Sequence, residues 1–208
     1  MNIKSKPIRN WDKKKAIFLD DRLLIGGYQV MMSWEKPLMH KMVEMLHSET
    51  QGDILEVGFG MGISATAIQS SGVKSHTIIE PHPEVYERAL GWRKSYPDSK
   101  IDIVRGYWQN IVAELKFYDG IFFDTFTPSD RGAQIKRLHF FLVASEKLLK
   151  PSGALVFYHM SSKLEYSYQK QLFKYFSKVF IERFDIIPPE DCRYAHIKDH
   201  TLCIIAVK

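Results

Sequence analysis

The chain has 208 residues, of which 45% are hydrophobic and 13% aromatic, enough for one well-packed domain and too few for two. Its formal net charge of +5 comes from scattered lysines and arginines, which favours a solvated positive surface over a nucleic-acid track. Residues 1–15 lack the apolar core of a signal peptide, and no apolar run reaches the roughly 18 residues of a membrane helix. We therefore expect a cytoplasmic protein with neither a membrane nor a nucleic-acid partner.

Cysteine and histidine spacing gives no sign of a metal or redox site. Cys192 and Cys203 form no C-x-x-C pair, so we expect two reduced thiols. The 8 histidines include no H-E-x-x-H, and His139 and His159 are expected in packing or surface roles. We expect no metal.

The first 50 residues predict an arm followed by a helix. Residues 1–28 are polar and punctuated by Pro7 and Gly26-Gly27, which indicates an irregular arm that folds back through a few apolar anchors. A helix is expected from about Ser33 to His47, with Pro37 in its first turn. Glu35 lies in that turn, where a carboxylate ordinarily serves only the helix dipole.

A glycine-rich turn at residues 53–64 organises the rest of the chain. An apolar strand, 53–57, runs into Gly58, Gly60 and Gly62, and a helix follows from Ile63. The spacing differs from the G-x-G-x-x-G of dinucleotide sites, and Glu56 just before the turn would repel phosphates. A ligand that carries ammonium or sulfonium charge, such as S-adenosylmethionine, fits this turn better than a dinucleotide.

The next strand ends in a second acid. Thr77–Glu80 is expected as a strand, followed by a helix from Pro81 to about Lys94 and a strand at Lys100–Val104. Glu80 follows the glycine turn by the interval at which an acid hydrogen-bonds a ribose. The aromatic pair at 107–108 comes next and offers an adenine a stacking face, although a core tryptophan explains it nearly as well.

The fourth strand, Tyr118–Asp124, is expected to lie beside the first, so that its end faces the reacting group. A helix from Gln134 to Leu149, a strand at Ala154–Tyr158, a helix from Tyr166 to Phe180 and a hairpin of 181–187 with 201–207 complete the chain. We predict an α/β fold with a doubly wound, Rossmann-like sheet, mostly parallel with a C-terminal antiparallel hairpin. We expect residues 1–208 to form a single domain. Its N-terminal part, residues 1–50, would be the arm and the first helix, and residues 51–208 would be the core.

Five stretches resemble the guanidinoacetate N-methyltransferase family of class I S-adenosylmethionine-dependent enzymes. They are V-M-M-S-W-E-K-P-L-M-H (30–40), L-E-V-G-F-G-M (55–61), G-Y-W (106–108), D-G-I-F-F-D-T (119–125) and P-P-E-D-C-R-Y (188–194). The likeness runs from about Trp11 to the end. It implies a methyltransferase fold with an arm covering the site.

The resemblance assigns residues to two ligands. It implies that Glu80 holds the ribose, that Trp108 lies by the adenine and that Trp11 covers the site. The whole cofactor site would comprise Trp11, Met31, Met39, Glu56, Gly58, Phe59, Gly60, Met61, Gly62, Ile63, Ser64, Glu80, Tyr107, Trp108 and Asp124. The substrate site would comprise Glu35, Asp124, Phe126, Ser161 and Ser162, with the two serines at the far end of the substrate.

Two carboxylates suit the chemistry of a guanidinium. Its pKa above about 12 and its delocalised lone pairs make it a poor nucleophile. One carboxylate can fix its plane through forked hydrogen bonds while the other accepts the departing proton. We assign orientation to Glu35 and proton acceptance to Asp124.

Departures from the family leave the substrate open. Phe126 stands where the family has tyrosine, a proline-rich turn becomes Thr127-Pro128, and the loop at 158–163 differs. Guanidinoacetate, arginine, agmatine and other natural guanidines all remain possible substrates. The protein is expected to be a monomer or a homodimer.

Other functions also remain open. The chain could methylate another small molecule, a nucleic-acid amine or a protein amine, or it could be a non-catalytic cofactor-binding module. Asp124-Thr-Phe-Thr127 lacks the prolines with which nucleic-acid amino-methyltransferases hold a flipped base.

Overall fold

A computed structural model of the chain describes residues 11–126, 130–159, 161–193 and 199–208, and for residues 130–136 it describes the backbone alone. The turn at Thr127-Pro128 and the motif residue Tyr194 lie outside the described residues. Both cysteines are free, as expected.

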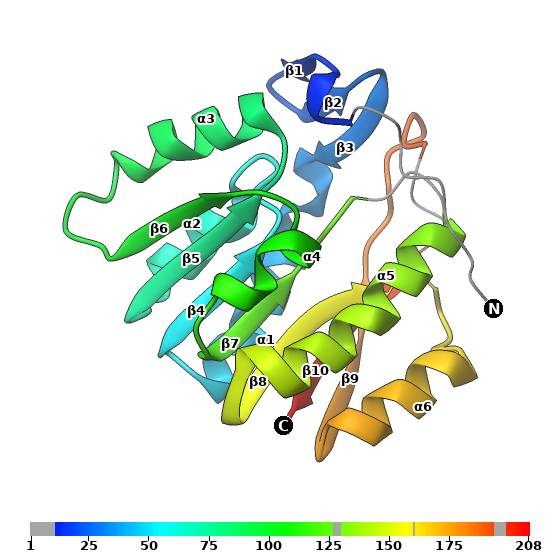
Figure 1. Cartoon of the computed structure of the whole chain (residues 1–208). Coiled ribbons are helices and arrows are strands. Elements are labelled where there is room, and N and C mark those ends of the chain that lie inside the picture. The colour runs from blue at the N-terminus through cyan, green and yellow to red at the C-terminus, as the bar shows by residue number, and fades with distance from the viewer. Residues whose placement is uncertain (1–10, 127–129, 160, 194–198) are drawn as a thin grey trace.

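A seven-stranded sheet forms the centre of the molecule (Figure 1), in the order β6-β5-β4-β7-β8-β10-β9. Its strands are β4 (Asp53–Val57), β5 (Ser75–Glu80), β6 (Ile101–Arg105), β7 (Tyr118–Phe123), β8 (Leu149–His159), β9 (Lys178–Asp185) and β10 (His200–Val207). Strands β4 to β8 pair in parallel, whereas β10 runs antiparallel to both β8 and β9. The predicted fold class is therefore confirmed. The strand order reverses between β4 and β7, and ligands of such sheets bind at that switch point.

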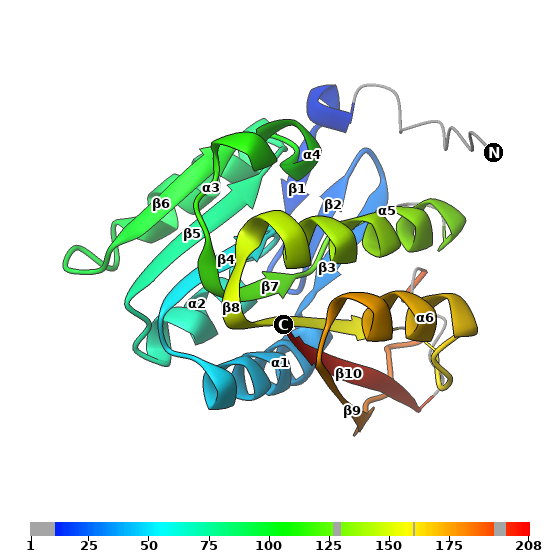
Figure 2. The same ribbon diagram turned by 60° about the horizontal axis from the view of Figure 1, so that its bottom comes forward.

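Helices cover both faces of this sheet (Figure 2). One face carries α1 (Lys36–Glu49), α2 (Ile63–Ser70) and α3 (Pro83–Arg93), and the other carries α4 (Trp108–Ile111), α5 (Asp130–Val143) and α6 (Tyr166–Tyr175). Short helical turns lie at η1 (Trp11–Lys13), η2 (Ser33–Glu35), η3 (Val112–Glu114) and η4 (Ala144–Leu148). Strand β4 is buried on both faces, since Ile54 packs toward α1 and Leu55 toward the opposite helices, which explains its continuous apolar run.

The expected irregular arm contains a three-stranded antiparallel sheet, so that prediction was wrong for the described residues. Its strands are β1 (Ala16–Phe18), β2 (Arg22–Ile25) and β3 (Tyr28–Met32). Ile25 pairs with Tyr28, which makes Gly26-Gly27 a two-residue hairpin loop with positive φ at both positions. These short strands are stabilised by burying Leu23 and Met31 against the main core, and no local sequence pattern reveals that packing.

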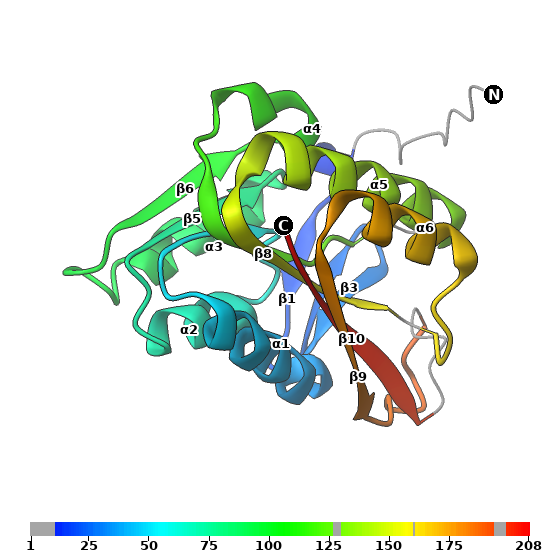
Figure 3. The ribbon, with the colours of Figure 1, turned by 90° about the horizontal axis from the view of Figure 1, so that it is seen from below.

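The end of the chain also differs from the expectation (Figure 3). The helix expected to reach Phe180 ends at Tyr175, because β10 draws the following residues into the sheet. The Ser177 N–H donates to the Val207 carbonyl oxygen at 2.8 Å, and Val179 pairs with Ala206.

The start of β8 and the start of the helix before it also differ from the predicted positions. The strand expected from Ala154 already begins at Leu149, which pairs with Tyr118 of β7. The helix before it starts at Asp130, ahead of the expected Gln134, and passes into a π-helical turn over Ala144–Leu148.

The close approach of β7 to the glycine turn fixes the switch point. The Asp124 N–H donates to the Val57 carbonyl oxygen at 3.2 Å. Gly58 has φ +98°, and a Cβ added there would overlap the Asp124 carbonyl oxygen. Only glycine therefore lets the exit of β7 lie against the end of β4.

We predict that Gly58→Ala destabilises the protein by more than about 3 kcal/mol, because it adds a backbone clash to a disfavoured φ. Gly91→Ala is the control, since its helical position in α3 has no atom within 4 Å of an added Cβ. That variant should be stabilised by about 0.5–1 kcal/mol. Urea unfolding followed by circular dichroism measures both changes, and equal midpoints for the two variants would contradict the packing at Gly58.

Candidate active site

The glycine turn lies directly beneath the N-terminal sheet. The Met61 N–H points to the Met31 sulfur at 3.2 Å, and a Cβ at Gly60 would lie 2.7 Å from that sulfur. His82 Nε2 and the Lys14 carbonyl oxygen lie 2.7 Å apart, which ties the sheet to the end of β5. The sequence-predicted Met31, Gly60 and Met61 are thus brought together.

Glu80 lies at the centre of these contacts. One carboxylate oxygen accepts from the Phe59 N–H at 3.1 Å and the other from the His82 N–H at 2.8 Å. Burial raises the pKa of Glu80 to about 7, the charge of Glu56 adds to the rise, and backbone hydrogen bonds from His82, Phe59 and Gly60 oppose it. A buried carboxylate with lone pairs left beside a glycine turn can accept hydroxyl protons of a ligand.

Glu56 is enclosed beneath the same turn. Its side chain is fully buried, accepts a hydrogen bond from the Ser64 hydroxyl, and lies 3.0 Å from His76 Nε2. The Glu56 and Ser64 side chains, both predicted to contact the cofactor, therefore turn toward each other and fix the start of α2. Their part in cofactor binding remains a prediction.

Aromatic side chains from the predicted cofactor set pack into the two cores. The Phe59 ring lies 5.5 Å from the Trp92 ring on the α1 face of the sheet. Trp108 is 5% exposed, and the Phe140 ring meets it edge-on with centroids 4.9 Å apart. Most of the Trp108 side chain therefore packs in the core, which was the alternative explanation for it. Tyr107 beside it is exposed and is the more accessible ring of the pair.

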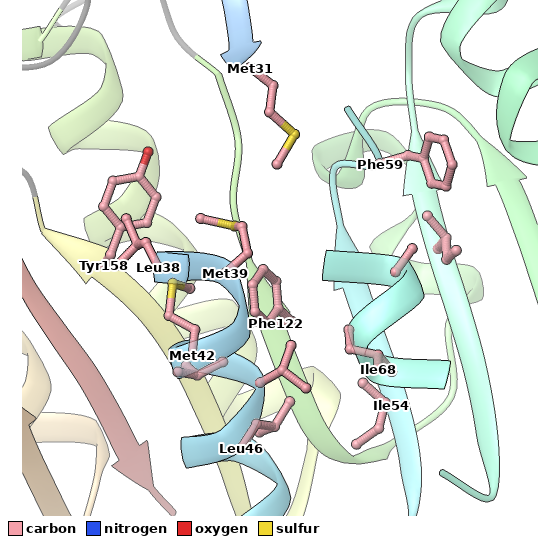
Figure 4. Close-up of a cluster of buried hydrophobic side chains, with 14 of the residues drawn as sticks. Met31, Leu38, Met39, Met42, Leu46, Ile54, Phe59, Ile68, Phe122 and Tyr158 are labelled. Atoms are coloured by element: carbon pink, nitrogen blue, oxygen red, sulfur yellow. The ribbon is translucent and has the colours of Figure 1, made fainter. Parts of the chain in front are cut away.

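Buried apolar residues form the floor of the site between α1 and β7 (Figure 4). Met39, predicted to line the cofactor, is fully buried there beside Phe122. The Tyr158 ring packs near Leu38, with its hydroxyl directed away from Met42 and toward the end of the cluster at which Met31 lies.

Three aromatic rings from distant segments meet at the exit of β7. Trp11 stacks on Phe126, with centroids 5.5 Å apart and planes inclined by 23°, and its edge meets His82 at 6.2 Å. Tyr28 of β3 lies 6.4 Å from Phe126. The Trp11 ring therefore lies against Phe126, two residues after Asp124, and its role in covering the site remains a prediction.

The two predicted catalytic carboxylates act on one tyrosine. Glu35 is 2% exposed and accepts a hydrogen bond from the Met32 N–H at 2.8 Å. Burial raises the pKa of the Tyr158 hydroxyl well above its usual value, and the charges of Asp124 and then Glu35 raise it further. The charges of Asp124, at the end of β7, and Glu35, at the start of α1, therefore both act on one buried hydroxyl.

Asp124 itself has an altered acidity. Burial raises its pKa to about 6, the Glu56 charge adds to this rise, and the positive charge of Arg137 opposes it. A carboxylate with a pKa near 6 is ionised at neutral pH but is a stronger base than an ordinary aspartate.

The Ser161-Ser162 turn follows β8. The Ser161 N–H donates to the His159 carbonyl oxygen at 2.8 Å, and its hydroxyl oxygen accepts from the Lys163 N–H at 3.3 Å. Ser162 is exposed.

Sequence reasoning missed three residues of this region: Gln29, Arg137 and Tyr158. The Gln29 amide donates to the Asp191 carbonyl oxygen at 2.9 Å and accepts from the Arg193 N–H at 2.7 Å, which holds the loop after β9 against β3. In the observed register Phe122 pairs with Val156, and two residues further along both strands Asp124 comes level with Tyr158, a relation that the sequence alone does not give. No local signal distinguishes Gln29 or Arg137.

In the ranges that the structure covers, no three histidine, cysteine, aspartate or glutamate side chains gather where a metal could bind. None of the helices it describes is long and apolar enough to cross a bilayer.

Comparison with known proteins identifies relatives. The family model for guanidinoacetate N-methyltransferase matches residues 5–207. "Protein arginine N-methyltransferase 2" of Kluyveromyces lactis is 35% identical over 154 residues, which cover 68% of this chain and 36% of that protein. The chain thus spans little more than a third of the length of this relative.

Solved structures share the fold at low identity. Spermidine synthase from Thermotoga maritima superposes with a TM-score of 0.62 at 15% identity, covering 90% of this chain and 64% of that one. The N-methyltransferase NodS from Bradyrhizobium japonicum gives 0.57 at 16% identity, covering 84% and 96%.

We predict that the Asp124 carboxyl titrates near pH 6 in the free protein, protonated below that pH and ionised above it. Asp53 is the internal control, because hydrogen bonds from Ser75 and then Lys150 lower its pKa. Carbon-13 NMR of labelled aspartates measures both groups in one titration. Replacing Arg137 by glutamine should move the Asp124 midpoint to higher pH, and an Asp124 midpoint near about 4 would show that the site is not desolvated.

Proposed function

The chain belongs to the guanidinoacetate N-methyltransferase family of S-adenosylmethionine-dependent methyltransferases, and from that premise we propose that it methylates a guanidino nitrogen of a small molecule. The observation that supports the proposal is that the charges of Asp124 and Glu35 both act on the buried Tyr158 hydroxyl, while the Asp124 N–H is hydrogen-bonded to the end of β4 beside the glycine turn. Two carboxylates that act on one region favour a planar cation as the ligand there.

The residues present fit S-adenosylmethionine. Glu80 would hold the two ribose hydroxyls, and the turn from Gly58 to Gly62 would lie along the rest of the cofactor, with Met31 behind it. When bound, the cofactor supplies an electrophilic methyl group on a sulfonium.

Glu35 and Asp124 have different roles in this proposal. Glu35, buried at the start of α1, neutralises the guanidinium and fixes its plane. Asp124 accepts the proton that leaves the nitrogen as the new N–C bond forms and the C–S bond breaks, and its raised pKa suits that role. Trp11 stacked on Phe126 limits the access of water to this position.

The alternatives differ in substrate or in turnover. One relative is named as a protein arginine N-methyltransferase, so an arginine side chain within a protein is an alternative substrate, with the same guanidinium group. Assays with small guanidines, an arginine peptide, RNA and DNA separate these substrates. Cofactor binding without turnover of any of them would favour a non-catalytic module.

We predict that Asp124→Asn lowers kcat for a guanidino substrate by about 10²–10⁴-fold while cofactor affinity changes less than about threefold, since the proton acceptor alone is lost. For the unaltered enzyme, kcat/KM should fall below about pH 6 as Asp124 becomes protonated. Asp185→Asn, an exposed change on β9, is the control. An Asp124→Asn enzyme with near-normal kcat would remove Asp124 from the mechanism.

We predict that Glu80→Ala weakens cofactor binding by about 10–100-fold, which corresponds to the loss of charge-assisted hydrogen bonds worth roughly 1.5–3 kcal/mol. The dissociation constant of Glu80→Gln should lie between those of the unaltered protein and Glu80→Ala, because the amide oxygen can still accept a hydrogen bond. Calorimetric titration with S-adenosylhomocysteine measures the dissociation constants, with exposed Glu87→Gln on α3 as the control. Equal constants for all four proteins would exclude Glu80 from the cofactor site.

A further inference from the structure

An arginine lies beside the carboxylates that are proposed to hold a cation. One terminal nitrogen of Arg137, on α5, donates to the Tyr158 carbonyl oxygen at 2.9 Å. Its guanidinium carbon lies 5.8 Å from the ring centroids of both Phe157 and Tyr158. These contacts hold the positive charge at the carboxyl end of β8.

The register of the sheet brings this charge next to Asp124. Phe122 of β7 pairs with Val156 of β8, and two residues further along both strands Asp124 falls level with Tyr158. The Arg137 charge correspondingly lowers the pKa of Asp124 against the effect of burial. A cation at this place repels a guanidinium substrate unless the substrate also brings an anion.

The hydrogen-bond partners of the Arg137 guanidinium among the described residues are neutral, and Asp124 is the acid on which its charge acts. These partners are the Tyr158 carbonyl oxygen and the Tyr168 hydroxyl, and Arg137 Nε is buried without a hydrogen-bond partner there. Glu165 lies 2.7 Å from His159 Nε2, and no described carboxylate forms an ion pair with Arg137. The site therefore offers a positive charge with capacity for an anionic partner.

We propose that Arg137 binds a carboxylate at the far end of the guanidino substrate and thereby selects free guanidino acids over guanidines that lack an anionic group. This inference rests on the proposed function. A guanidinium binds a carboxylate through two parallel hydrogen bonds, so Arg137 would recognise both charge and shape. The Arg137 charge acts on Asp124, and the Ser161-Ser162 turn comes shortly after the end of β8, the strand whose Tyr158 carbonyl oxygen accepts from Arg137.

The proposal separates two substrate classes that share a guanidinium. Guanidinoacetate, 3-guanidinopropionate and free arginine carry a carboxylate. Agmatine and methylguanidine carry none, and an arginine inside a peptide has its carboxyl group tied up in an amide. Arg137 would favour the first class.

The test compares kcat/KM for guanidinoacetate, free arginine, agmatine and a blocked arginine peptide, with S-adenosylmethionine present. We expect the unaltered enzyme to prefer the acids by at least about tenfold, the size of one charge-assisted contact. Arg137→Gln should reduce the ratio of acid to agmatine by about tenfold or more, mainly through KM, and Arg137→Lys should retain part of it. Arg183→Gln on exposed β9 is the matched control and should leave the ratio unchanged.

Each outcome supports or overturns the proposal. An unaltered enzyme that methylates agmatine or the peptide as well as the acids overturns it, even where Arg137→Gln fails to fold. Equal losses for all substrates in a folded Arg137→Gln protein also overturn it, because a purely structural arginine would give that result. An enzyme that turns over no guanidine overturns the proposed function as well, whereas turnover without preference overturns this inference alone.

Discussion

The parallel pairing of β4 with β7 is the contact on which the site depends. The Asp124 N–H bonds to the Val57 carbonyl oxygen, and the Asp124 carbonyl oxygen occupies the space beside Gly58 that a side chain would fill. This pairing places the end of the fourth core strand at the glycine turn, where the strand order reverses. The proposed proton acceptor and cofactor turn are therefore held together by main-chain contacts within one rigid sheet.

Burial away from water changes the acidity of the carboxyl groups near the glycine turn. Burial raises the pKa of Glu80 to about 7 and that of Asp124 to about 6, while Glu56 is enclosed between Ser64 and His76. Several acids near one turn repel each other, so the site gains from a bound cation. Arg137 supplies one fixed positive charge at its edge, and a guanidinium with a sulfonium cofactor would supply the others.

The N-terminal sheet and the loop after β9 complete the walls. Met31 of β3 contacts the glycine turn, Trp11 stacks on Phe126, and Gln29 holds the backbone on both sides of Cys192. Segments more than 160 residues apart in the chain, such as Gln29 and Asp191, therefore meet at one end of the sheet. The structural neighbours share the fold at low identity, and we expect substrate choice to arise in these walls.

The sequence by itself determined the alternation of strands and helices, the glycine turn and the strand-end acids, because burial on both faces and positive φ leave local marks in residue type. Tertiary structure decided the rest. The N-terminal strands depend on packing against the main core, and β9 begins early because β10 offers backbone partners to Ser177 and Val179. Arg137 and Tyr158 reached the site through strand register and helix placement, which join residues that no short stretch of chain contains.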